Sequence, residues 1–331
     1  MILHLKKSTP VDLINWLKKE AYARILEFDS YTQAVTTKAF KEIPEFLSSF
    51  VIENWTFETD IQLASLDFTE KREVSIGQDK IGGLTKNIHL IAGPCSVESE
   101  EQIFQVAHKL VELGIKSLRA GSFKPRTSPY SYMGMEKEGL ELLSKVRKET
   151  GLNIVSEVRD ATNVELVLEH ADVVQIGTKS MYDHGILNAC GNSDKTILIK
   201  RGFGTTLQEF VQPAEFVLCA GNENVILCER GIRTFESKTR FTLDLCGVAY
   251  LKHHCNLPII VDPSHALGYR YGIIDLAKAS TAMGIDGLLV ESHPNPPAAL
   301  SDAAQQIDFK TLEILKSEIK NLSLALNLNL T

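Results

Sequence analysis

The sequence predicts a (β/α)₈ TIM barrel over residues 87–331, preceded by a small α+β ferredoxin-like domain over residues 1–75. Eight short apolar runs alternate with amphipathic segments from residue 87 onward, which is the pattern of such a barrel. The first 75 residues follow a different order of strand-like and helix-like patterns. Residues 76–86 lie between the two parts and are rich in charge and glycine, which is typical of a linker.

The sequence pattern of residues 1–75 predicts a split β-α-β arrangement. Alternating patterns predict strands at residues 1–6, 23–28, 33–37 and within 51–68. Apolar residues at positions 11, 13, 14 and 17 have helical spacing and predict a helix over 11–20, and a second helix is expected over 43–50. The order strand–helix–strand–strand–helix–strand is that of a ferredoxin-like sandwich.

The eight apolar runs are near-continuous, as expected for parallel strands buried on both faces. They lie at residues 89–92, 116–119, 153–156, 173–176, 196–199, 225–227, 258–261 and 287–290. Amphipathic segments such as 100–113, 136–149 and 160–170 predict the intervening helices. A doubly wound open sheet is the alternative, but it usually carries a glycine-rich dinucleotide turn after its first strand. Here that turn reads Gly-Pro-Cys-Ser.

Composition narrows the class of protein. The 331 residues carry 42 acidic and 35 basic side chains, and this net charge of −7 argues against a nucleic-acid partner. Six cysteines without a CxxC pair are typical of a reduced intracellular protein. No apolar stretch is long enough for a membrane span, and the N-terminal apolar run is too short for a signal peptide. We therefore expect a cytoplasmic protein without a membrane or nucleic-acid partner.

Basic residues gather just after the predicted strands, where the chemistry of such barrels lies. They are Arg119, Lys124, Arg126, Lys179, Lys200, Arg201, Arg230 and Arg233. Converging cations repel one another unless anions neutralise them, and Arg and Lys are the side chains that bind phosphate and carboxylate. For any one of these residues a solvated surface charge is the alternative. As a group they predict a pocket for a phosphorylated small molecule.

A second set of strand-end residues predicts a metal site. Cys95, His265 and Glu291 follow or end the first, seventh and eighth predicted strands, which are neighbours when the barrel closes. Asp302 lies beyond a proline-rich loop and is expected to reach back to them. Thiolate, imidazole and carboxylates together suit Mn²⁺, Fe²⁺, Co²⁺ or Zn²⁺. For Cys95 alone, a small buried apolar side chain is the alternative.

At these residues the sequence resembles the type I 3-deoxy-D-arabino-heptulosonate-7-phosphate (DAHP) synthases, in particular the branch with an N-terminal ferredoxin-like domain. The resemblance rests on motifs spread over residues 88–310. The motifs are Gly93-Pro-Cys-Ser-Val-Glu-Ser, Phe123-Lys-Pro-Arg-Thr-Ser-Pro-Tyr-Ser, Cys228-Glu-Arg-Gly-Ile-Arg-Thr-Phe-Glu, Val261-Asp-Pro-Ser-His, His293-Pro-Asn-Pro and Leu300-Ser-Asp302.

The resemblance implies condensation of phosphoenolpyruvate with erythrose 4-phosphate to give DAHP and phosphate, the first step of the shikimate pathway. It implies a divalent metal, with Mn²⁺ placed first, held by Cys95, His265, Glu291 and Asp302. Substrate contacts are implied for Arg119 and Lys124 (carboxylate), Lys179, Lys200 and Arg230 (phosphate), Arg126 and Thr127 (erythrose 4-phosphate), and Glu157 near the reacting centre. Lys124, His265 and Cys95 are the implied catalytic residues, and either Lys124 or a metal-bound water would relay the proton.

Two departures from the family pattern bear on function. Lys179 stands where the family usually has Arg, which keeps the charge and loses the bidentate fork. In the N-terminal part, the His and Ser of effector-sensing relatives are not evident at Phe28-Asp-Ser-Tyr. Inhibition by tyrosine or phenylalanine is therefore a hypothesis that rests on domain order. Exposed apolar helix faces favour a homodimer or homotetramer.

Three other functions compete with this interpretation. 3-Deoxy-manno-octulosonate-8-phosphate synthase shares the barrel and phosphoenolpyruvate, but its pattern is Lys-Ala-Asn-Arg-Ser where this chain has Lys124-Pro-Arg-Thr-Ser. A Schiff-base aldolase would use Lys124 or Lys200 as nucleophile. A binding or regulatory relative without activity would explain Lys179 and the apolar loop around residues 297–300.

Overall fold

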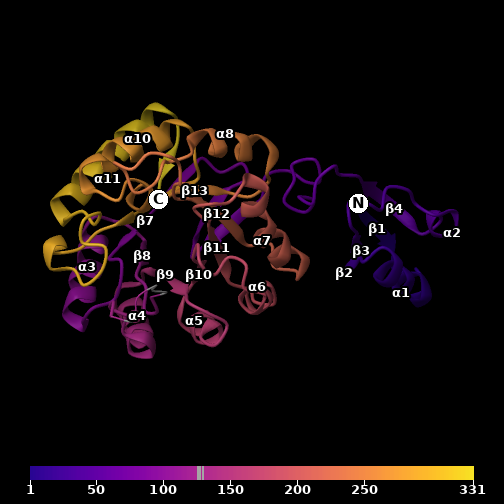
Figure 1. Cartoon of the computed structure of the whole chain (residues 1–331), viewed down its shortest axis with the longest axis horizontal. Coiled ribbons are helices and arrows are strands. Elements are labelled where there is room, and N and C mark those ends of the chain that lie inside the picture. Colours follow the sequence, from indigo (N-terminus) through magenta and orange to yellow (C-terminus); the bar gives the residue numbers. More distant parts are fainter. Residues whose placement is uncertain (125–127, 129) are drawn as a thin grey trace.

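The computed structural model describes residues 1–124, 128 and 130–331, and contains a closed barrel with a small sheet beside it (Figure 1). The eight barrel strands are parallel, and β14 pairs with β7 to close the ring. They are β7 (Asn87–Gly93), β8 (Ser117–Arg119), β9 (Asn153–Val158), β10 (Val173–Ile176), β11 (Thr196–Lys200), β12 (Val225–Glu229), β13 (Ile259–Val261) and β14 (Gly287–Glu291). The predicted (β/α)₈ barrel is confirmed. Near the C-terminus, β15 (Asn329–Leu330) adds in parallel beside the start of β7.

Helices cover the outside of the barrel. They are α3 (Glu100–Glu112), α4 (Glu136–Thr150), α5 (Val164–His170), α6 (His184–Gly191), α7 (Leu207–Cys219), α8 (Leu245–His254), α9 (Pro263–Leu267), α10 (Ile273–Ala282) and α11 (Phe309–Ala325), with short 3₁₀ turns at Arg270–Gly272 and Pro296–Ala298. Side-chain caps begin several of them, including a reciprocal Thr206–Glu209 capping box at α7. Among the described residues, no helix has the length and apolar character needed to cross a bilayer.

A β-hairpin closes the amino-terminal end of the barrel. It consists of β5 (Glu73–Ile76) and β6 (Asp79–Gly82). Its buried residues Val74, Ile76 and Ile81 join the cluster of side chains inside the barrel, and the carbonyl of Ser75 accepts a hydrogen bond from Thr196 at the start of β11. The segment expected as a linker over residues 76–86 therefore includes half of a packed hairpin. The packing of Val74, Ile76 and Ile81 was not expected, because charged residues and glycines surround them in the sequence.

The N-terminal part is a four-stranded antiparallel sheet with two helices. Its elements are β1 (Ile2–Lys6), α1 (Val11–Glu20), β2 (Arg24–Glu27), β3 (Tyr31–Val35), α2 (Glu45–Ser48) and β4 (Val51–Trp55). The strand order β2-β3-β1-β4 is that of a ferredoxin-like sandwich. Leu3 and Leu5 pack with α1 and α2 on one face, whereas Ile2, on the other face, belongs to the barrel's core. Strand alternation thus buries both faces of β1.

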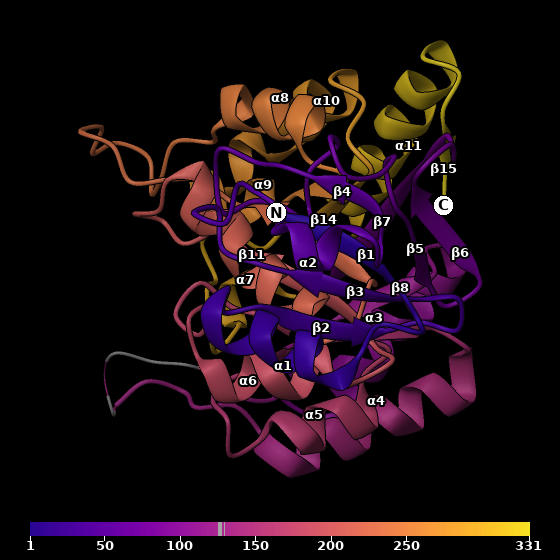
Figure 2. The same ribbon diagram turned by 90° about the vertical axis from the view of Figure 1, so that its right-hand side faces the viewer.

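A connecting segment attaches the sheet to the barrel, and the sheet lies in front of the barrel in Figure 2. The buried carboxylate of Glu215 on α7 accepts hydrogen bonds from the backbone N–H groups of Gln62 at 2.7 Å, Leu63 at 3.1 Å and Ala64 at 2.8 Å. The N-terminal amine of Met1 in turn donates to the side chain of Gln62 at 2.8 Å. These contacts fix the position of the small sheet on α7.

Candidate active site at the carboxyl ends of the barrel strands

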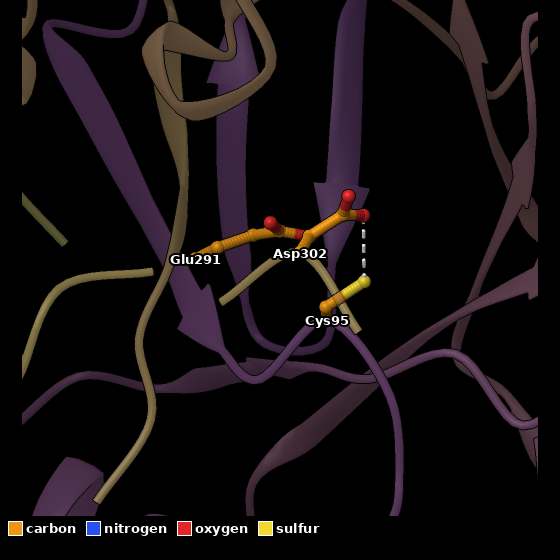
Figure 3. A group of neighbouring side chains, drawn as sticks. All are labelled: Cys95, Glu291 and Asp302. Carbon is orange, nitrogen blue, oxygen red and sulfur yellow. Dashed lines mark hydrogen bonds between the residues drawn. The ribbon is translucent and has the colours of Figure 1, made fainter. Parts of the chain in front are cut away.

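Three of the four predicted metal ligands form a compact cluster. Cys95 lies in the loop after β7, Glu291 ends β14, and Asp302 comes from the loop beyond it. One ligand atom from each lies within 4.8 Å of the others. Figure 3 shows Cys95 and Asp302 pointing toward each other, with Sγ donating to Oδ2 at 3.1 Å. Asp302 has a left-handed backbone with φ of 49°, which is uncommon for a residue other than glycine.

His265, the fourth predicted ligand, lies beside this cluster. It belongs to the first turn of α9, and Asp262 caps that turn by accepting the His265 backbone N–H at 3.0 Å. The same carboxylate lies 2.7 Å from the ring Nδ1. The opposite ring atom, Nε2, is 3.5 Å from Oε1 of Glu291. A carboxylate on Nδ1 leaves Nε2 as the free ligand atom, which is the usual arrangement of a metal-binding histidine.

The electrostatics of the cluster fit a bound cation. Burial and then Glu291 raise the pKa of the Cys95 thiol to about 12, so the thiol keeps its proton without a cation. Burial alone would raise the pKa of Asp302, but the charge of His265 and the hydrogen bond from Cys95 lower it to about 2. A divalent cation would displace the thiol proton and take the position between thiolate and carboxylates. The four donors present suit a borderline transition metal.

Two predicted substrate-binding cations lie directly against the cluster. Arg119 ends β8, and its Nη1 donates to Glu291 Oε1 at 2.7 Å and to the Pro94 carbonyl at 2.8 Å. Lys124 Nζ lies 3.0 Å from the Cys95 carbonyl and 3.2 Å from its Sγ. Burial alone would lower the pKa of Lys124, but Cys95 and Glu157 raise it. Lys124 therefore remains an ammonium ion beside the metal-ligand cluster.

The other predicted cations have different surroundings. Lys200 Nζ lies 2.5 Å from Asp262 Oδ2, so its charge is neutralised by a buried carboxylate. Arg201 is held between Glu229 at 2.9 Å and Asp244 at 2.8 Å. Lys200 and Arg201 therefore hold neighbouring loops together through ion pairs with buried or half-buried carboxylates. Lys179 is exposed in the turn after β10, and Arg126 and Thr127 lie outside the described residues.

Arg230 differs from these cations because its charge is buried without an ion pair at its Nε and Nη1 atoms. Both atoms are buried and have no hydrogen-bond partner. Burial lowers the pKa of this guanidinium, which is the sign of an uncompensated cation. A buried donor without an acceptor is costly. Arg230 is therefore prepared to receive an anion at the carboxyl end of β12.

Glu157 projects from β9 near the turn that follows β10. Its Oε2 accepts a hydrogen bond from Gln175 at 2.9 Å. Gly177 follows β10, and a Cβ at that position would lie 2.0 Å from Oε1 of Glu157. The glycine therefore leaves room for the Glu157 carboxylate. The charge of Glu157 acts on Lys124 and Arg119, so it faces the predicted substrate pocket.

Sequence reasoning missed three residues that hold the predicted ligands. Asp262 is the first. Its position directly before Pro263 could have identified it as the residue that caps a helix. Gln305 donates to Glu291 Oε2 at 2.5 Å and accepts from Arg240 at 2.7 Å. Gln306 accepts the Cys95 backbone N–H at 2.9 Å. Neither glutamine had a sequence signal beyond its closeness to Asp302, since their partners are distant in the chain.

A cleft beside Asp302 gives access to this end of the barrel. It has a volume of about 410 Å³ and is lined by Ser237, Thr239, Arg240, Gly268, Tyr269, Asp302, Ala304 and Gln305. The lining includes the cation Arg240, whose Nη1 is 3.6 Å from Asp302 Oδ1. A cleft of this size next to a metal-ligand cluster suits a small charged substrate.

Comparisons with known proteins agree with this geometry. A sequence model of the DAHP synthetase I family matches residues 66–327. The chain is 43% identical over 266 residues to phospho-2-dehydro-3-deoxyheptonate aldolase of Thermotoga maritima, covering 80% of this chain and 78% of that protein. It is 32% identical over 253 residues to 2-dehydro-3-deoxyphosphooctonate aldolase of Syntrophotalea carbinolica, covering 71% and 89%.

The structural comparison extends over both parts of the molecule. The crystal structure of phospho-2-dehydro-3-deoxyheptonate aldolase (DAHP synthase) from Thermotoga maritima superposes with a TM-score of 0.81 at 37% identity. The match covers 100% of this chain and 99% of that one, so the similarity includes the N-terminal sheet. The chain belongs to the DAHP synthetase I family.

Proposed function

We propose that this protein is a DAHP synthase, which condenses phosphoenolpyruvate with erythrose 4-phosphate and water to give DAHP and phosphate at the start of the shikimate pathway. One observation carries the proposal. The Cys95, Glu291 and Asp302 cluster lies within hydrogen-bond distance of the buried cations Arg119 and Lys124. A metal site beside fixed cations is what a reaction between two phosphorylated substrates requires.

The phosphoenolpyruvate site is assigned to cations from four strand ends. Arg119 and Lys124 bind the carboxylate, and Arg230 binds the phosphate with Lys179 and Lys200. Arg119 is held rigidly by Glu291 and the Pro94 carbonyl, so little side-chain freedom is lost on binding. Arg126 and Thr127 contact erythrose 4-phosphate, and Glu157 lies near the reacting centre. Together these residues hold both substrates in line.

The reaction requires a new carbon–carbon bond and loss of phosphate. A divalent metal at this site supplies Lewis-acid polarisation of the aldehyde. C3 of phosphoenolpyruvate bonds to the aldehyde carbon, and water adds at C2. Phosphate then leaves from C2. Cys95 and Glu157 outweigh the effect of burial and raise the pKa of Lys124, so its Nζ carries a proton beside the site. Lys124 gives this proton to the developing alkoxide, which is a stronger base than the amine.

The metal is held by Cys95, His265, Glu291 and Asp302, and we place Mn²⁺ first among Mn²⁺, Fe²⁺, Co²⁺ and Zn²⁺. Phosphate release should stop after EDTA treatment and return when Mn²⁺ is added. Cys95→Ala should abolish activity because it opens the ligand set. Full activity of Cys95→Ala would overturn the ligand assignment. Activity that persists in EDTA, together with trapping by borohydride, would instead support a Schiff-base aldolase.

The four-carbon aldose is favoured over arabinose 5-phosphate. Identity to the heptonate aldolase is 43%, against 32% to the octonate aldolase. Phosphate release measured with each aldose separates the two activities. We expect turnover with erythrose 4-phosphate only. Turnover with arabinose 5-phosphate alone would assign the octulosonate activity, and binding of phosphoenolpyruvate without turnover would assign a binding protein.

Residues 1–75 are proposed as a regulatory domain that responds to tyrosine or phenylalanine. A cavity of about 350 Å³ lies between the sheet and the barrel. Stacked and edge-packed rings of Phe28, Tyr31, His4, Trp55 and Phe68 contribute to its lining. An aromatic side chain fits such a lining. Unchanged activity in millimolar tyrosine and in millimolar phenylalanine would overturn this proposal.

We also propose that the protein forms a homo-oligomer and is located in the cytoplasm. A homodimer or homotetramer is supported by exposed aromatic side chains on the outer helices, such as Tyr250 on α8 and Phe216 on α7. Light scattering of the purified protein should give a mass of two or four chains, and a monomer would contradict it. The absence of a spanning helix among the described residues is compatible with the proposed cytoplasmic location.

A further inference from the structure

Two phenylalanine rings form a column with arginines at its ends. The Arg230 guanidinium carbon lies 4.3 Å from the centroid of the Phe241 ring. Phe241 stacks on Phe203, with centroids 5.5 Å apart and planes 22° apart. Arg233 covers Phe203 at 4.7 Å. Phe203 follows β11, whereas Phe241 belongs to the loop between β12 and α8, so the column joins two neighbouring loops.

The column leaves the hydrogen-bonding edge of Arg230 available. A guanidinium that stacks on a ring uses its π face, while its N–H donors lie in the plane and point outward. Nε and Nη1 of Arg230 indeed have no hydrogen-bond partner. Arg201, the neighbouring buried arginine, is held instead by Glu229 and Asp244. An aromatic ring therefore holds Arg230 without a carboxylate that would compete with an incoming anion.

The backbone around the column is shaped for this contact. Gly231 follows Arg230 with φ of +94°. A Cβ at Gly231 would lie 2.8 Å from Cβ of Phe241 and 3.0 Å from Cα of Ala266. Any larger residue would push Phe241 away from Arg230. The Arg233 backbone N–H also donates to the Phe203 carbonyl, which fixes the two loops to each other.

We propose that Phe241, supported by Phe203, is a positioning residue that orients Arg230 toward the phosphate of phosphoenolpyruvate. The inference rests on the proposed function, because it takes Arg230 as a phosphate ligand. It adds a role for two aromatic side chains that act through Arg230. Removing the ring face frees the guanidinium to turn, so the effect falls on phosphate and not on carboxylate recognition.

Calorimetric titration of the Mn²⁺-loaded protein with phosphoenolpyruvate, inorganic phosphate and pyruvate tests this inference. Phe241→Leu should weaken phosphoenolpyruvate and phosphate binding by about tenfold. It should leave the affinity for pyruvate, which carries a carboxylate and no phosphate, unchanged. Phe241→Tyr keeps the ring face and should restore wild-type affinity. Phe235→Leu is the matched control, since Phe235 lies in the same loop and is fully exposed.

The outcomes separate the two proposals. Equal weakening of pyruvate and phosphate in Phe241→Leu would show a general loss of structure and overturn the positioning role. Should Phe241→Leu fail to fold, Phe203→Leu gives the same comparison, with a smaller loss expected. Arg230→Ala serves as the reference. If it weakens phosphate binding while Phe241→Leu does not, the positioning inference fails alone, and if it has no effect, the assignment of Arg230 itself fails.

Discussion

Asp262 binds His265 twice, through its backbone N–H at 3.0 Å and its ring Nδ1 at 2.7 Å. One carboxylate therefore fixes both the first turn of α9 and the orientation of the imidazole. The same carboxylate neutralises Lys200 at 2.5 Å. A carboxylate behind a metal-binding histidine fixes its tautomer and raises its basicity as a ligand.

Asp262→Asn should weaken Mn²⁺ binding by about 10- to 100-fold, because an amide orients the imidazole less firmly and leaves Lys200 without its counter-charge. The signal of free Mn²⁺ in electron paramagnetic resonance measures the dissociation constant. Asp275→Asn is the control, since Asp275 is exposed on α10. Equal Mn²⁺ affinity in Asp262→Asn and wild type would remove Asp262 from the metal site.

Gln305→Met should weaken Mn²⁺ binding by about tenfold. The substitution removes the hydrogen bond to Glu291 and the acceptor for Arg240, while it keeps a side chain of similar length. Competition with a chelating dye measures the affinity. The exposed Gln208 on α7 provides the matched variant Gln208→Met. A loss of thermal stability without any loss of Mn²⁺ affinity would mean that Gln305 serves packing alone.

Ile81→Ala should lower the free energy of unfolding by about 3 kcal/mol. Ile81 is fully buried in the hairpin that closes the barrel, so its removal leaves a cavity. Urea unfolding followed by circular dichroism measures the change. Ile52→Ala, at a half-exposed position on β4, should cost far less. Equal losses at the two positions would indicate that the hairpin adds no core to the barrel.

The stability of the contact between the sheet and α7 should depend on pH through Glu215. Burial raises the pKa of this carboxyl from its ordinary 4.5 to about 7, and hydrogen bonds from residues 62–64 oppose that shift. Between these values the unfolded chain releases the proton while the folded chain keeps it. The stabilising contribution is therefore present below pH 4.5 and is lost as the pH rises to about 7.

Glu215→Gln stays neutral at every pH and isolates this effect. The free energy of unfolding of the wild type, relative to Glu215→Gln, should fall from pH 4.5 to 7 with a slope of at most about 1.4 kcal/mol per pH unit. Glu165→Gln, at an exposed position on α5, should leave the pH profile of the wild type unchanged. A constant difference between wild type and Glu215→Gln across this range would contradict the raised pKa.

Much of the barrel could be predicted because its signal is local. Each buried parallel strand is a short apolar run, and the run at residues 173–176 coincides with β10. The family motifs also led to the correct family. The hairpin that begins before residue 76 and ends within residues 76–86 was not predicted. Its pairing of Val74 with Ile81 is local, but Ile81 packs against barrel residues that are distant in the chain.

The closeness of the predicted metal ligands could be expected from their strand-end positions, whereas the contacts of the individual side chains could not. Cys95, Glu291 and Asp302 were expected together and lie together. The pairing of Lys200 with Asp262 was not foreseen, since strand-end position shows where a cation lies and not which carboxylate it meets. The contact of Phe241 with Arg230 likewise depends on how two loops pack.

The most direct test of the central claim is a crystal structure of the protein grown with Mn²⁺ and phosphoenolpyruvate, with anomalous diffraction recorded at the manganese edge. We expect one strong anomalous peak from a manganese ion bound by Cys95 Sγ, His265 Nε2, Glu291 and Asp302. We also expect the phosphate within hydrogen-bond distance of Arg230 and the carboxylate against Arg119 and Lys124. A peak away from these four ligands, or a phosphate that does not contact Arg230, would contradict the central claim.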